Sequence, residues 1–162
     1  MIFDFKSESD FNKWFSINDG VMGGVSSGRL EPSGAHTALF KGNVSFENNG
    51  GFSSVRSEKI NIDFSGTSAL ILRVKGDGKK YKFRIQSSIH PSDVLYECVF
   101  HPSSSDWEEV TLPYKEFNVV RRGMRLKNEP PLDASTIQSL GFLISSQQEG
   151  PFELMIDWIK VL

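Results

Sequence analysis

The sequence predicts an all-β fold, an antiparallel β-sandwich with few or no helices, in a single domain over residues 1–162. Hydrophobic and polar residues alternate with a period of two in segment after segment, which is typical of strands that bury one face. Turn-forming residues separate these segments at intervals of roughly 8–12 residues. The 13 Phe and 3 Trp add large apolar side chains that favour pleated, half-buried surfaces.

The expected strands follow from the alternating segments in chain order. They lie at residues 44–46, 52–56, 60–64, 70–75, 81–86, 96–100, 140–144 and 152–158. The NNGG sequence at 48–51 and the GDG sequence at 76–78 each separate two such strands, so each is predicted to form a hairpin turn. Short helical turns are expected near 9–13 and 133–140, where Asp133 could act as an N-cap.

Four side chains are assigned to the interior on the same grounds. Cys98 alternates with Tyr96 and Phe100, so packing in the core or at a sheet edge is expected. The three tryptophans are also predicted to pack in the core: Trp14, Trp107 and Trp158.

Charge and composition narrow the possible functions. A net charge of −2 and a pI near 5.9 provide no general attraction to nucleic acid or to anionic lipid. No apolar run approaches the ~20 residues that a membrane span requires. No signal or transit peptide is visible, so a cytoplasmic location is expected, and a lone cysteine suits a reducing compartment.

The most unusual stretch is NDGVMGGVSSG at residues 18–28. Its glycines allow positive φ angles, and its backbone N–H groups could hold an anion or let a ligand approach closely. A dinucleotide-binding loop is disfavoured because Pro32 and Gly34 follow where a helix is required. The stretch is either a simple connection or a recognition loop, whose contact residues would be Asn18, Asp19, Met22, Gly23, Gly24 and Ser26.

A second candidate lies on the predicted strand at 52–56, where Phe52 and Arg56 share one face. An arginine beside aromatic and small residues can hold a carboxylate or phosphate through two parallel hydrogen bonds. The alternative is an arginine that pairs with Glu58 or Asp19.

The basic run at residues 121–127 is a third candidate, with Arg121 and Arg122 as its binding residues. It could form a docking surface for an acidic partner or a phosphate-bearing ligand. It could equally be a solvated loop balanced by nearby acids. Nucleic-acid binding is not expected, because the run lacks interleaved aromatic residues.

Four segments together resemble the complex I intermediate-associated protein 30 family: WFSINDGVMGGVSSG, FKGNVSFENNGGFSSVR, VKGDGKKYKFRI and GPFELMIDWIKV. They run in the family's order from about Trp14 to Val161. The resemblance implies a galactose-binding-like, two-sheet antiparallel jelly roll, related in architecture to carbohydrate-binding modules. It also implies a role in respiratory complex I assembly without catalysis, although this chain, which starts at the domain, looks more like the bare-domain bacterial members.

No cofactor or metal site is predicted, although jelly rolls of this type often hold a structural calcium. Asn18, Asp19 and Asp77 have the hard oxygen donors that calcium requires, and Asx turns are the alternative explanation of these residues. The sequence therefore predicts a non-catalytic binding module for a protein partner such as a respiratory-complex assembly intermediate. The alternative is a carbohydrate-binding module with its glycan on the concave sheet. No nucleophile or acid–base pair indicates an enzyme.

Overall fold

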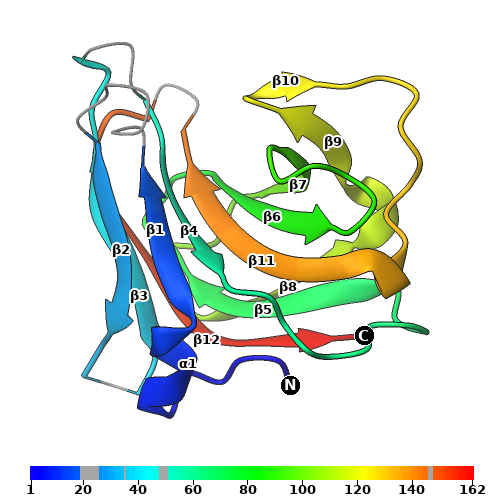
Figure 1. Ribbon diagram of the computed structural model, residues 1–162. Helices are drawn as coiled ribbons and strands as arrows, with labels where there is room; N and C mark the ends of the chain where they lie inside the picture. Colours follow the sequence, from blue (N-terminus) through cyan, green and yellow to red (C-terminus); the bar gives the residue numbers. More distant parts are fainter. Residues whose placement is uncertain (19–25, 35, 48–50, 146–147) are drawn as a thin grey trace.

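The computed structural model describes residues 1–18, 26–34, 36–47, 51–145 and 148–162. Two antiparallel sheets face each other across one core (Figure 1), as predicted. The seven-stranded sheet contains, in spatial order, β1 (Trp14–Asn18), β4 (Ser53–Ser57), β11 (Ile137–Ile144), β6 (Tyr81–Ser87), β7 (Val94–Phe100), β9 (Asn118–Arg121) and β10 (Met124–Arg125). The five-stranded sheet contains β2 (Ser27–Pro32), β3 (Ala38–Val44), β12 (Gly150–Val161), β5 (Ala69–Lys75) and β8 (Glu108–Pro113).

Helical structure in the described residues is limited to short pieces. They include α1 (Glu8–Asn12) and the 3₁₀ turns η3 (Tyr114–Glu116) and η4 (Ala134–Thr136). Asp133 caps η4 as predicted, since its side chain accepts a hydrogen bond from the backbone N–H of Ser135. The turn ends earlier than expected because β11 begins at Ile137. None of the helices in these ranges has the length and hydrophobicity needed to cross a membrane.

Both predicted hairpins are wrong. The strands on either side of residues 48–51 lie in different sheets, because β3 belongs to the five-stranded sheet and β4 to the seven-stranded sheet. The GDG sequence at 76–78 likewise connects β5 of one sheet to β6 of the other. In both places the apolar faces of consecutive strands pack on the same core from opposite sides.

The predicted strand at 60–64 is also wrong, since these residues belong to the connection between β4 and β5. Ile62 is 44% exposed, whereas Phe64 is buried in the core. The backbone N–H of Ile60 donates to Gln138, but no ladder continues from it in the described residues. The apolar residues of this segment anchor a connection: Phe64 is buried, and Ile60 is partly buried against the core. They do not form a strand, because a strand also requires a partner along its length.

Of the three tryptophans, Trp14 is buried as predicted, with its ring 5.9 Å from that of Phe142 between centroids. Trp158 is half-exposed because a β-bulge between Ile156 and Trp158 shifts the alternation of β12. Its ring lies beneath Lys160, whose Nζ is 4.4 Å from the ring centroid. Trp107 is also half-exposed, just before β8 begins. The core prediction is therefore wrong for these two residues.

Cys98 is buried on the inner face of β7, which confirms its predicted packing. Burial raises the pKa of its thiol to about 11, and the charges of Glu116 and Glu97 add to this shift. Because the thiolate is the reactive form, we expect iodoacetamide at pH 8 to label folded Cys98 about 100-fold more slowly than the urea-unfolded chain. Intact-mass spectrometry measures both rates on this lone cysteine, and equal rates would contradict its burial.

Candidate binding site

The outer face of the seven-stranded sheet, which points away from the core, carries the candidate site. The sheet is strongly curved, from β1 and β4 round to the β9–β10 hairpin (Figure 1). A cavity of about 360 Å³ lies over this face. We call it the arginine cavity, and its lining residues are Ile17, Gly51, Phe52, Ser54, Arg56, Lys82, Arg84, Asp93, Leu95, Arg122, Gly123, Leu143 and Ser145.

The strand register places Arg56 and Arg84 on either side of Gly141. Gly141 pairs directly with Arg56 of β4 and with Arg84 of β6, and directly paired residues of antiparallel strands point to the same face. The two arginine backbones are thus two strand spacings, about 10 Å, apart. A Cβ at position 141 would lie only 2.8 Å from the carbonyl oxygen of Val55. A side chain here would thus collide with the β4 backbone, and glycine lets β11 pack closely against β4 between the two arginines.

The positive charges of this face exceed the negative ones. Glu97 of β7 is only 8% exposed and pairs with two cations at once. Its carboxylate lies 2.7 Å from Nε of Arg84 and 3.6 Å from Nζ of Lys82. One carboxylate thus faces two cations, and one positive charge remains uncompensated within this group.

Arg56 has no such partner among the described residues, and the predicted pairing with Glu58 does not form. Burial lowers the pKa of the Arg56 guanidinium, and the positive charge of nearby Arg84 lowers it further. Both causes disfavour a charged group, yet a guanidinium remains charged in proteins. Arg56 is therefore a partly desolvated cation next to another cation. Asp19, the other predicted partner, lies outside the described residues.

The β9–β10 hairpin brings a further arginine to the cavity. Arg122 and Gly123 have φ angles of 49° and 80°, so the chain reverses through the left-handed region between the two strands. Arg122 lines the arginine cavity from this turn. Arg121 lies beside it, with Nε 3.4 Å from the carboxylate of Asp93. Arg122 is thus part of the site, and Arg121 is held in an ion pair at its margin.

The structure therefore brings together three of the predicted binding residues, Phe52, Arg56 and Arg122. Asn18 and Ser26 instead hold the backbone in place. The Asn18 amide donates to the Gly28 carbonyl and accepts from the Ser53 hydroxyl, and the Ser26 hydroxyl bonds to the backbone of Ser45. The predicted Asp19, Met22, Gly23 and Gly24 lie outside the described residues.

Asp77 does not line the arginine cavity. Its carboxylate accepts a hydrogen bond from the backbone N–H of Glu153 and lies 3.6 Å from Nζ of Lys79. The oxygens of Asp77 and Asn18 that calcium would need thus already accept hydrogen bonds within the fold. The described part of the chain also contains no cluster of three or more His, Cys, Asp or Glu side chains suited to a metal ion.

Lys82 and Arg84 were not among the predicted site residues, because they are simply the polar half of the alternation in β6. One signal could have identified them. Lys82 and Arg84 lie on one face of β6 and Lys80 lies just before it, so three cations recur at every second residue without an acid between them. Lys82 and Arg84 line the same cavity as Arg56 because β11 pairs with both β4 and β6, and this pairing is not visible in the sequence.

Comparison with solved structures defines the class of protein as a two-sheet antiparallel β-sandwich with the fold of known carbohydrate-binding modules. A family 11 carbohydrate-binding module from Clostridium thermocellum, in complex with a β-1,3-1,4-mixed-linked tetrasaccharide, has a TM-score of 0.74 at 17% identity. The likeness covers 100% of this chain and 94% of the module. An exo-β-agarase matches with a TM-score of 0.63 at 12% identity, over 100% of this chain and 24% of the agarase. Likeness at these identities defines the fold alone.

The sequence identifies the family within this class. The sequence model of the Complex I intermediate-associated protein 30 family matches residues 3–156, so the chain belongs to this family. The mitochondrial Complex I intermediate-associated protein 30 of Mus musculus is 29% identical, over 99% of this chain and 55% of the mouse protein. A probable counterpart in Caenorhabditis elegans is 25% identical, over 85% of this chain and 46% of its own length. The chain thus spans about half the length of these two relatives.

Proposed function

We propose that the chain is a non-catalytic binding module that holds an acidic group of a protein partner in the arginine cavity. The observation that carries this proposal is the environment of Arg56, whose guanidinium is half-buried and has no carboxylate partner among the described residues. A desolvated cation without a counter-ion gains most from an incoming carboxylate, because a charged hydrogen bond replaces missing solvation.

The surroundings of Arg56 suit this role. A carboxylate placed over Gly141 would lie between Arg56 and Arg84, and Arg122 would approach it from the β9–β10 turn. The buried side chains of Leu95 and Leu143 form an apolar part of the lining, which strengthens the attraction between charges by excluding water. Binding of this kind is an equilibrium process that requires no bond to be made or broken.

The lining of the cavity supports binding rather than catalysis. Its ionisable side chains are Arg, Lys and a single carboxylate, Asp93, which is paired with Arg121. General acid–base catalysis needs a proton donor and acceptor whose pKa values lie near neutral pH. The arginines and lysine of this cavity instead match the needs of an anion-binding site.

Family membership supports a protein as the ligand. The name of the mouse relative associates that protein with an intermediate of complex I. We extend this role to the present chain as a proposal: the partner is a component of a partly assembled respiratory complex, and one of its acidic side chains enters the arginine cavity. The chain would then act as an assembly factor with a chaperone-like role.

Arg56→Gln is expected to weaken partner binding by about 10- to 100-fold, which corresponds to the loss of one hydrogen bond between charged groups. The measurement is quantitative affinity capture with the tagged protein from gently solubilised lysate of its host, read by mass spectrometry. The matched control is Arg29→Gln, because Arg29 is an exposed arginine of β2 whose Nε lies 2.6 Å from Glu31.

Respiratory-complex proteins retained by the wild type and by Arg29→Gln, but lost by Arg56→Gln, would support the proposal. Circular dichroism must show that both variants keep the wild-type fold. Equal retention of these proteins by all three chains would contradict the role of the arginine cavity.

A carbohydrate ligand is the second candidate, favoured by the ring of Phe52 and the apolar lining beside it. Aromatic and apolar side chains can stack on the faces of sugar rings, whereas neutral glycans do not require a basic cavity. Titration with a β-1,3-1,4-mixed-linked tetrasaccharide distinguishes the two. Saturable binding that Arg56→Gln leaves unchanged would favour the neutral glycan, and a flat titration would exclude this ligand.

A further inference from the structure

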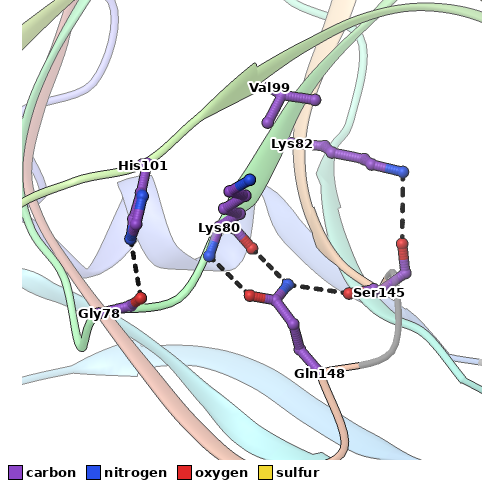
Figure 2. A pocket seen from close by; sticks show the side chains of 7 residues that line it. All are labelled: Gly78, Lys80, Lys82, Val99, His101, Ser145 and Gln148. Atoms are coloured by element: carbon purple, nitrogen blue, oxygen red, sulfur yellow. Dashed lines mark hydrogen bonds between the residues drawn. The ribbon is translucent and has the colours of Figure 1, made fainter.

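A second cavity adjoins the arginine cavity on the same sheet face. It has a volume of about 500 Å³ and shares Lys82 and Ser145 with the arginine cavity. We call it the lysine cavity, and its other lining residues include Lys80, Val99 and His101. Figure 2 shows the side chain of Lys82 directed towards Ser145. The Nζ of Lys82 lies 3.4 Å from the hydroxyl oxygen of Ser145, and both residues line the two cavities.

The walls of the lysine cavity are held by hydrogen bonds to the backbone. The side-chain amide of Gln148 accepts from the Lys80 N–H at 2.7 Å and donates to the Lys80 carbonyl at 2.8 Å. The ring Nε2 of His101 lies 2.8 Å from the carbonyl oxygen of Gly78 (Figure 2). These contacts fix the backbone from which the lysines project.

Charge and hydrophobicity indicate what this surface can bind. The side chains that line the lysine cavity include two lysines and no carboxylate. Val99, which is 55% exposed, adds an apolar contact beside the lysines. The whole chain carries a net charge of −2, so the positive charge of the two cavities is a local feature. An anionic ligand with some apolar surface is complementary to this arrangement.

The spacing of the cations matches an extended polypeptide. Lys82 and Arg84 lie on one face of β6, and Lys80 immediately precedes that strand. Alternate residues of a strand are about 6.8 Å apart, and so are the same-face side chains of any extended chain laid alongside it. Carboxylates on every second residue of such a chain would each meet one cation.

We propose that the arginine and lysine cavities form one continuous track for an extended acidic protein segment with carboxylates on alternate residues. This inference rests on the proposed function and specifies its partner. One carboxylate lies at Arg56 and Arg84, and the following ones lie at Lys82 and Lys80. An anionic glycan shares the charge but not the spacing of a strand, so the polypeptide is the ligand that the row along β6 favours.

Fluorescence anisotropy with three labelled hexapeptides tests the track. One alternates glutamate with threonine, the second has the same composition with its three glutamates in a block, and the third has a single glutamate. We expect the alternating peptide to bind about 10-fold more tightly than the block peptide, since each additional exposed ion pair contributes modestly. Lys80→Gln should lower the affinity for the alternating peptide about 3-fold and leave the affinity for the single-glutamate peptide unchanged.

The matched control is Lys41→Gln, because Lys41 is a partly exposed lysine of β3 on the other sheet, 3.2 Å from Glu31. Equal affinities for the alternating and block peptides would contradict the proposed track. An affinity for the alternating peptide that Lys80→Gln leaves unchanged would contradict it as well. A different result would contradict the proposed function: an affinity for the single-glutamate peptide that is the same for Arg56→Gln and for the wild type. An oligogalacturonate that binds more tightly than the alternating peptide, and depends on Lys80, would overturn the assignment to a polypeptide.

Discussion

Glu97→Gln is expected to lower the stability of the protein and, at the same time, to tighten the binding of anions. Glu97 is the carboxylate that Arg84 and Lys82 share, and both cations are largely buried. Removal of its charge leaves two cations uncompensated next to Arg56. We expect a loss of about 2 kcal/mol, below the range for fully buried pairs because the freed side chains can turn towards water. For a chain of this size, the Tm should fall by about 4–8 °C.

The same substitution provides a second readout with the opposite sign. Sulfate should raise the Tm of Glu97→Gln more than it raises the Tm of the wild type, because the cavity gains one unit of positive charge. Sodium chloride at equal ionic strength controls for screening. Glu109→Gln is the control variant, since Glu109 is an exposed acid of β8. An unchanged Tm together with an unchanged sulfate response would contradict the proposed charge balance.

Phe142→Ala is expected to produce the largest loss of stability, about 3–5 kcal/mol, through lost burial and a residual cavity. Phe142 is fully buried in β11. Its ring centroid lies 5.1 Å from that of Phe83, 5.9 Å from that of Trp14 and 6.3 Å from that of Phe100. Urea unfolding followed by Trp fluorescence measures the change in the free energy of unfolding.

The matched control for Phe142→Ala is Phe15→Ala. Phe15 lies on β1 of the same sheet but is 49% exposed, so its removal should cost less than about 1 kcal/mol. A loss below about 1 kcal/mol for Phe142→Ala as well would mean that this aromatic cluster contributes little to the stability of the core.

Much of the local structure could be predicted because strand alternation is a property of neighbouring residues. In β6, the side chains of Tyr81, Phe83 and Ile85 are fully buried, as their period of two requires. The same rule correctly placed Phe52 and Arg56 on one face. It failed at Trp158, where a bulge shifts the alternation by one residue.

The sequence by itself thus determined that the fold is an all-β sandwich, where most of its strands lie, and which family the chain belongs to. It also indicated that Arg56 and Arg122 could each bind an anion. Only the tertiary structure decided which sheet each strand joins and which cations share a cavity. The physical reason is that strand pairing joins residues far apart in the chain: Gly141 of β11 separates Arg56 of β4 from Arg84 of β6. Alternation specifies which way a side chain points, but the ladder of hydrogen bonds and the curvature of the sheet determine its neighbours.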